Sequence, residues 1–142
     1  MLKMLIAVDG SEHAQHAIEA VARLARASTP CDVVLLNVRD FPLVFGDLPP
    51  LNYEQIEEAQ KQAQEQVLAA ALAHARECGL ALVSKRSAQG LAAPEIVRVA
   101  TECGADQIVL GTRGMGALGS LFMGSVAQRV VHLAEVPVLL VK

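Results

Sequence analysis

The sequence has almost no aromatic residues: three Phe, one Tyr and no Trp occur among its 142 residues. Proteins that bind single-stranded nucleic acid stack bases on exposed aromatic rings, so this scarcity argues against such a function. The net charge of −3 also leaves no basic surface for DNA or for an anionic membrane. The core must therefore consist of aliphatic side chains, which suits helices packed on a parallel sheet.

Cysteine and long apolar runs are also scarce. The three cysteines, Cys31, Cys78 and Cys103, lie far apart and form no Cys-x-x-Cys pair. This pattern disfavours a disulfide framework or a zinc site and is typical of a reducing compartment. No stretch approaches the roughly 20 apolar residues of a membrane span, and the apolar run at residues 4–8 is too short for a signal peptide. We therefore expect a cytoplasmic protein with no nucleic-acid or membrane partner.

What the chain does have is a repeating pattern of strand and helix within one domain, residues 1–142. The expected strands are residues 3–8, 32–38, 80–86, 105–110 and 136–141. Four helices are expected. The first follows Ser11 as its N-cap, and the second runs from Asn52, as N-cap, to Cys78, with Gly79 just beyond its end. The third begins with Pro94 and closes at Gly104, and the fourth spans residues 125–133. Residues 41–51, with three prolines and a glycine, are expected to form a loop.

Alternating strands and helices predict an α/β fold: a single doubly wound parallel sheet with helices on both faces. The strand at residues 80–86 is the least apolar, so we expect it near a sheet edge. The first half of the long helix has few apolar residues other than Ile56 and Ala59, so it should project past the sheet.

Five of the ten glycines lie between Gly111 and Gly124, in the segment joining the fourth strand to the last helix. Glycine lets the backbone approach a ligand closely, and the start of a helix adds N–H groups and a positive dipole end. Phosphate is the ligand that suits such a segment. The Ser125 hydroxyl and the Arg113 cation add polar groups to it.

Two common phosphate motifs do not fit this segment. The GxGxxG over residues 114–119 should open a helix directly and be followed by an acid about 20 residues later. Here Ser-Leu-Phe-Met follows, and Lys142 stands near the distance expected for the acid. A Walker A loop requires a Gly-Lys dipeptide, which the chain lacks. The spacing that remains is G-x2-G-x9-G-S, with fixed positions at Gly111, Gly114, Gly124 and Ser125.

This spacing resembles the G-x2-G-x9-G-[ST] signature of the ATP-binding branch of the universal stress protein family and matches it at every fixed position. The resemblance extends along the chain, through residues 6–13, 36–38, 109–114, 125–130 and 137–141. It implies a five-stranded sheet of order 3-2-1-4-5. In that order Asp9, after the first strand, and Gly111, ending the fourth, would flank one crevice at the strand reversal.

The resemblance also implies roles for individual residues. Asp9 and Val38 would lie beside the adenine of ATP, next to a strand end formed by Ala7 and Val8, with Met115 packed on the base. Ribose and phosphates would be held, mostly by backbone N–H groups, at Gly111, Gly114, Gly124, Ser125 and Val126. Arg113 would either contact phosphate or be a solvated loop arginine, and Asp9 also fits a turn preceding the first helix. Mg²⁺ would accompany ATP, bound through phosphates and water.

No acidic residue occurs in residues 111–125, whereas ATP hydrolysis usually requires a carboxylate or Gln near the γ-phosphate. The resemblance therefore favours a sensor or regulator of the stress response with slow or no hydrolysis. A slow ATPase and a nucleotide-free dimeric interaction module are the alternatives. A phospho-accepting receiver domain is disfavoured, because Ser-Lys-Arg-Ser at residues 84–87 stands where an Asp should follow the third strand.

Two further expectations concern partners. The strand at residues 136–141 would be an apolar edge strand, which invites pairing with another chain. The family is typically dimeric through this strand, so the resemblance implies a homodimer. His13 and His16 have only Glu12 close to them in sequence and are expected to be surface residues, with no bound metal.

Overall fold

The computed structural model describes residues 1–41, 50–113 and 124–142, with the side chains of residues 50–52 left out. Five parallel strands form one sheet of order β3-β2-β1-β4-β5, as expected. The strands are β1 (Leu2–Ala7), β2 (Cys31–Arg39), β3 (Leu82–Gln89), β4 (Gln107–Gly111) and β5 (Val138–Val141). The helices are α1 (Glu12–Ala27), α2 (Pro50–Glu77), α3 (Ala92–Cys103) and α4 (Ser125–Leu133).

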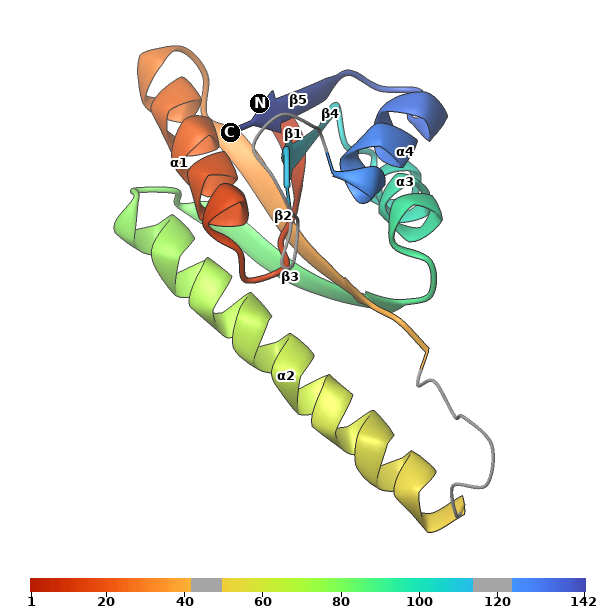
Figure 1. Ribbon diagram of the computed structural model, residues 1–142. Helices are drawn as coiled ribbons and strands as arrows, with labels where there is room; N and C mark the ends of the chain where they lie inside the picture. The colour runs from red at the N-terminus through yellow and green to blue at the C-terminus, as the bar shows by residue number, and fades with distance from the viewer. Residues whose placement is uncertain (42–49, 114–123) are drawn as a thin grey trace.

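Helices cover both faces of the sheet, which makes the fold doubly wound. Helices α1 and α2 lie on one face, and α3 and α4 lie on the other (Figure 1). Successive β1 residues enter different cores, since Met4 and Ile6 pack with α1 and α2 whereas Leu5 packs with α3 and α4. Because both faces of the central strands are buried, β2 and β4 contain continuous apolar runs.

The ends of three helices follow the chemistry of their terminal residues. The Ser11 hydroxyl accepts a hydrogen bond from the Ala14 N–H (3.2 Å) and caps α1. Gly79 after α2 and Gly104 after α3 have left-handed φ angles of 93° and 69°, which glycine adopts without steric cost. These three predictions are confirmed.

Two helix starts were predicted wrongly. Helix α2 begins at Pro50, so Asn52 lies inside it and does not cap it. Helix α3 begins at Ala92, so Pro94 is its third residue and not its first. Proline fits throughout the first turn, because those N–H groups have no intrahelical acceptor. Most of the expected loop, residues 42–49, lies outside the described residues.

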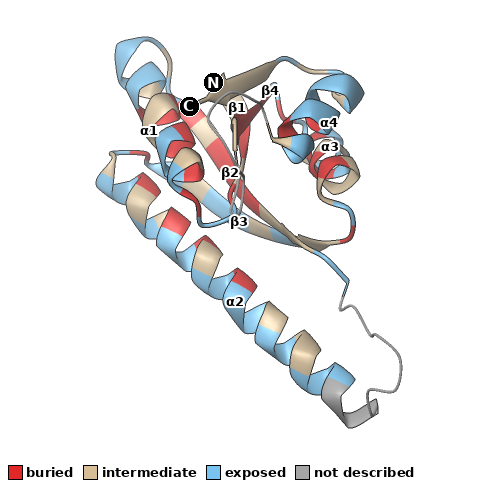
Figure 2. Ribbon diagram, viewed as in Figure 1, coloured by how far each residue is buried: buried red, intermediate tan, exposed pale blue. Residues whose placement is uncertain are grey.

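Helix α2 packs its apolar side chains on the sheet mainly through its second half. Its second half places Leu68 and Ala75 against the sheet, at 1% and 0% exposure, while its first half extends beyond the body of the domain, as expected (Figure 2). Strand β3 is an end strand of the sheet, also as expected, and its exposed side carries charged side chains such as Arg86, paired with Glu102 on α3 (2.6 Å). Within residues 1–41, 50–113 and 124–142, no helix is long and apolar enough to cross a membrane.

The anchoring of α2 can be tested with a pair of leucines. Leu68→Ala should lower the free energy of unfolding by about 2–5 kcal/mol, because it removes a buried side chain and leaves a cavity. Leu24 on α1 is 44% exposed, so Leu24→Ala should cost less than about 1 kcal/mol. Urea denaturation of both variants measures the difference. Equal losses would show that α2 does not depend on this contact.

Candidate functional site

The strand order brings two distant segments together at the carboxyl edge of the sheet. Strand β1 pairs with β2 on one side and β4 on the other, so the winding direction reverses between β1 and β4. Asp9 follows β1 and Gly111 ends β4, so both lie at this reversal. Ligands of open α/β sheets bind at such a switch point. The expected crevice between these strand ends is therefore consistent with the observed topology.

Gly111 is required by the protein's own packing. A Cβ atom at this position would lie 2.7 Å from the His13 Cβ and 2.8 Å from the His13 carbonyl carbon. The end of β4 thus passes directly against the first turn of α1. The absence of a side chain at Gly111 allows these two elements to meet beside the crevice.

Gly124 fastens the start of α4 to the end of β4. Its N–H donates to the Thr112 carbonyl (2.6 Å), and the Thr112 N–H donates to the Val141 carbonyl on β5 (2.8 Å). A Cβ at Gly124 would lie 3.2 Å from the Thr112 oxygen, closer than most real Cβ contacts. The Gly124 N–H is therefore already bonded within the protein, which differs from its expected role as a phosphate donor.

The N–H groups directly after Gly124 are not bonded to any described residue. Gly124 is the N-cap of α4, and the first bond of the helix runs from the Gln128 N–H to the Gly124 carbonyl (3.0 Å). The N–H groups of Ser125, Val126 and Ala127 precede that bond and have no acceptor among the described residues. Because Ser125 and Val126 are exposed, the start of α4 can bind an anion.

The other end of the crevice lies between β1 and β2. Ala7 and Val38 are half-buried on the α3–α4 face, and Val8 is buried on the other face. The paired register of the two strands ends at Ala7 opposite Leu36, while β2 continues to Arg39. This leaves a space beyond β1 that is bordered by the backbone of Val38.

Asp9 has a structural role at the entrance to α1. Its Oδ1 accepts a hydrogen bond from the Ser11 N–H (3.0 Å), which forms the expected turn before the helix. The side chain is exposed. Of the other predicted residues, Arg113 is half-buried one residue after Thr112, while Gly114 and Met115 lie outside the described residues.

Sequence reasoning missed two polar residues beneath this edge. The Asn37 side-chain amide donates to the Val8 carbonyl (2.7 Å), and the Gln64 amide donates to the carbonyls of Asn37 (2.9 Å) and Ala88 (3.0 Å). Gln64 on α2 is only 6% exposed. It lies on the same buried face of that helix as Leu68, Ala71 and Ala75. A polar residue at an apolar position of the helical repeat was the sequence feature that could have identified Gln64 as a buried hydrogen-bonding residue.

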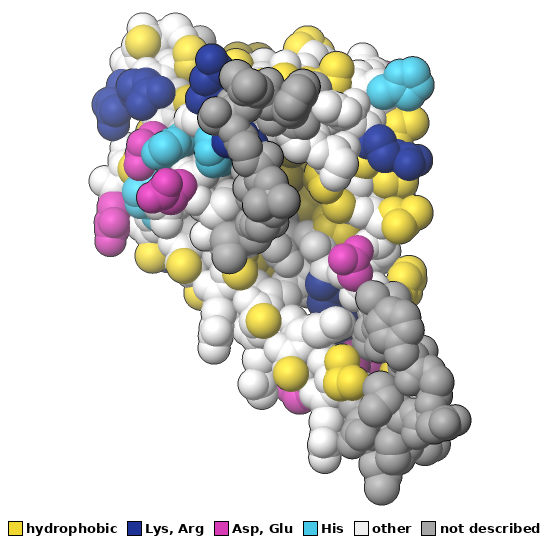
Figure 3. All heavy atoms as spheres, in the orientation of Figure 1, with side chains coloured by type: hydrophobic (Ala, Val, Ile, Leu, Met, Phe, Trp, Pro, Cys, Tyr) yellow, Lys and Arg dark blue, Asp and Glu magenta, His cyan; other side chains and the backbone are white. Residues whose placement is uncertain are grey.

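Cysteine and histidine side chains do not form an activated nucleophile or a metal centre in the described residues. Burial raises the pKa of the Cys31 thiol and of the Cys78 thiol, and the Glu19 carboxylate raises that of Cys78 further; a reactive thiol needs the opposite shift. Histidine and acidic side chains gather over α1 (Figure 3). However, no group of three His, Cys, Asp or Glu within those residues could hold a metal ion.

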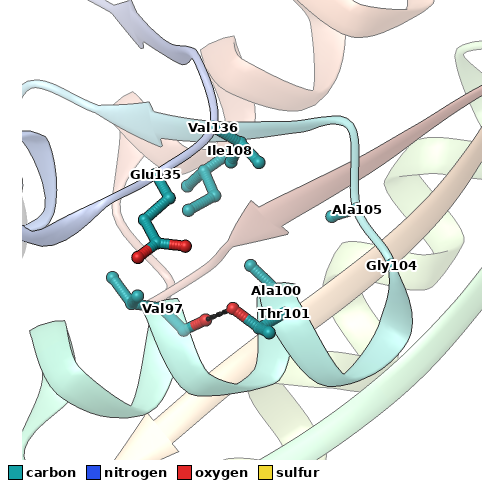
Figure 4. A pocket seen from close by; sticks show the side chains of 8 residues that line it. All are labelled: Val97, Ala100, Thr101, Gly104, Ala105, Ile108, Glu135 and Val136. Atoms are coloured by element: carbon teal, nitrogen blue, oxygen red, sulfur yellow. Dashed lines mark hydrogen bonds between the residues drawn. The ribbon is translucent and has the colours of Figure 1, made fainter.

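A separate hollow of about 250 Å³ lies at the opposite edge of the sheet. It is bounded by α3 and by the segments that precede β4 and β5, and the Glu135 carboxylate points across it (Figure 4). The Thr101 hydroxyl on its wall already donates to the Val97 carbonyl (3.1 Å). This hollow contains none of the residues that the sequence predicted for the site.

The parallel sheet with helices on both faces makes this chain a doubly wound α/β domain (Figure 1). Domains of this class bind ligands at the carboxyl ends of their strands, which is where the switch point and the start of α4 lie. The chain belongs to the universal stress protein family, whose model matches residues 1–142. A universal stress protein of Thermus aquaticus is 39% identical over 142 residues, covering 98% of this chain and 97% of that one.

Solved structures show the same fold. The universal stress protein UspA of Lactobacillus plantarum superposes with a TM-score of 0.85 at 19% identity, over 99% of this chain and 97% of that chain. The Archaeoglobus fulgidus universal stress protein, solved in complex with dAMP, gives a TM-score of 0.67 at 27% identity, over 100% and 98% of the two chains.

The packing role of Gly111 gives a direct test. Gly111→Ala should lower the free energy of unfolding by about 1–3 kcal/mol, the usual cost of overpacking, because the three nearest atoms are the Cβ and two backbone atoms of His13 and cannot rotate away. Thermal or urea unfolding without nucleotide measures this effect. Wild-type stability in Gly111→Ala would show that β4 and α1 do not require this close approach.

Proposed function

We propose that this protein binds an adenine nucleotide, with ATP as the preferred ligand, across the carboxyl ends of β1, β2 and β4. The observation that carries the proposal is the start of α4. Three N–H groups without described acceptors follow Gly124, and the Gly124–Thr112 hydrogen bond fixes them beside the strand reversal. An anionic phosphate at this position gains both hydrogen bonds and the helix dipole.

The two ends of the crevice suit the two ends of a nucleotide. Phosphates bind at Ser125 and Val126, close to Gly111 and Arg113, and the base lies at the other end beside Ala7, Val8, Asp9 and Val38. The dAMP complex of the 27% identical A. fulgidus relative supports an adenine nucleotide as ligand. Contacts from Gly114 and Met115 stay predictions of the family signature.

The bound nucleotide serves a regulatory function in this proposal, with slow or no hydrolysis. Residues 111–125 contain no carboxylate that could position water at a γ-phosphate. Asp9 lies at the base end and accepts a hydrogen bond from the Ser11 N–H. Mg²⁺, where it accompanies ATP, is held by phosphate oxygens and water. Such a protein reports nucleotide state to a partner in the cytoplasm.

The phosphate end can be tested by adding one negative charge. Ser125→Asp should lower ATP affinity at least about 10-fold, or about 1.4 kcal/mol, because the carboxylate repels phosphate. An acid in the first helical turn is compatible with the helix dipole, so α4 should stay folded. Ser125→Asn has the same shape without the charge and serves as control. Isothermal titration calorimetry with ATP and adenosine measures both variants.

Adenosine lacks phosphate, so its affinity should change less than about twofold in Ser125→Asp. Equal ATP affinity in the Asp and Asn variants would contradict phosphate binding at the start of α4. Failure of the wild-type protein to bind ATP, AMP and adenosine would contradict the proposed function as a whole.

A second part of the proposal is a homodimer through β5. The carbonyls of Pro137 and Val141 accept from Ile108 and Thr112 on the β4 side (3.0 and 2.8 Å). The peptide groups of Val138 and Leu140 therefore face away from β4, at the free edge of the sheet. All four β5 side chains are half-buried, and an unpaired apolar edge suits pairing with the same edge of a second copy.

Proline at Val138 tests this edge. Val138→Pro removes an outward N–H and leaves the bonds to β4 intact, with little change in side-chain volume. Sedimentation velocity at micromolar concentration should give twice the monomer mass for the wild-type protein and the monomer mass for Val138→Pro. A wild-type monomer under these conditions would refute the dimer.

A further inference from the structure

The hydrogen-bond ladder between β1 and β2 stops before β2 ends. Its last bond runs from the Val8 N–H to the Leu36 carbonyl (2.8 Å). On the other side of β2, the Gly90 N–H donates to the Arg39 carbonyl (2.9 Å). The backbone groups of successive β2 residues therefore point in turn to β1 and to β3: those of Leu36 face β1, and those of Arg39 face β3.

Val38 lies two residues after Leu36, so its peptide groups also face β1. If the ladder continued, the Val38 N–H would donate to the Val8 carbonyl. That carbonyl instead accepts from the Asn37 side-chain amide at 2.7 Å. The Val38 N–H has no acceptor among the described residues, and it borders the space beyond β1.

The Asn37 amide is itself held by the structure around it. Gln64 donates from α2 to the backbone carbonyls of Asn37 and Ala88, at 2.9 and 3.0 Å. These bonds fix the end of β2 against β3, and Gln64 is buried at 6% exposure. Asn37 therefore approaches Val8 from a backbone that α2 holds in place.

We infer that Asn37 is a positioning residue for the nucleobase. With its side chain on the Val8 carbonyl, the β1–β2 ladder ends one step early and the Val38 N–H is left without an acceptor among the described residues. The N–H and the C=O of one residue can together bind a planar base edge that offers one acceptor and one donor, as adenine does. The inference rests on the proposed nucleotide function and names the residue that prepares its base end.

Asparagine suits this position for a specific chemical reason. Its amide donates to a carbonyl, whereas a carboxylate of the same shape only accepts hydrogen bonds. In Asn37→Asp the Val8 carbonyl loses its side-chain donor, and the Val38 N–H becomes the nearest group able to replace it. The β1–β2 ladder then extends by one hydrogen bond, and the Val38 N–H is no longer able to bind the ligand.

Amide hydrogen exchange in the nucleotide-free protein tests this directly. In the wild-type protein the Val38 N–H should exchange at least about 10-fold faster than the Val8 N–H, which is bonded in the ladder. In Asn37→Asp the Val38 N–H should become protected at least about 10-fold. Asn37→Ala, which also lacks the donor, should show the same protection without an added charge.

Calorimetry of the same variants gives the ligand readout. Adenosine, AMP and ATP should all lose affinity by the same factor, at least about 10-fold, because they share the base. Pyrophosphate, which has no base, should bind as it does to wild type. Gln62→Glu, an exposed change on α2 with the same added charge, should leave all four affinities unchanged.

The outcomes separate this inference from the proposed function. A Val38 N–H that is already protected in the nucleotide-free wild-type protein would overturn the inference even if ATP binds. Loss of pyrophosphate and adenosine affinity by equal factors in both Asn37 variants would also overturn it, since that result indicates general destabilisation. Rapid Val38 exchange with no nucleotide binding would refute the proposed function, and with it the role of Asn37 toward the base, while still showing that the ladder ends early.

Discussion

The early end of β1 is the constraint on which the candidate site depends. β1 pairs with β2 only as far as Ala7, and β2 continues to Arg39. In a sheet buried on both faces, an unfinished ladder leaves backbone groups without partners unless something else supplies them. Asn37 supplies one for the Val8 carbonyl. The Val38 N–H, which faces β1, has no acceptor among the described residues, and this is the group that we propose for the base end of the ligand.

The architecture was predictable because local signals and the global fold agree. Continuous apolar strands, the Ser11 cap and the glycines after α2 and α3 each indicated the same alternation of strand and helix. Helix starts were less predictable, since proline and asparagine both fit the first turn at more than one position. The errors at Asn52 and Pro94 therefore shifted the starts of α2 and α3 by three and two residues and left the topology unchanged.

The sequence predicted those parts of the candidate site that local motifs or the family resemblance carry, and it missed the contacts between polar side chains that are distant in sequence. The start of α4 follows from Gly124 and Ser125 themselves. The contacts of Asn37 with Val8 and of Gln64 with Asn37 join residues 29 and 27 positions apart. No periodicity links such pairs, because only the packing of α2 on the sheet brings them together. Polar contacts between residues this far apart in sequence can be read from the structure but not from the sequence pattern.

The glycine signature is weaker evidence for nucleotide binding than its spacing suggests. Gly111 is small because β4 meets His13, and the Gly124 N–H is bonded to Thr112. Gly111 would be required in a protein with this packing even if it bound nothing, and the N–H of Gly124 is already used within the protein. The proposal of a nucleotide therefore rests on groups that have no acceptor among the described residues, namely the first N–H groups of α4 and the Val38 N–H. A family member that kept the glycines but bonded these groups internally would keep the fold without the ligand.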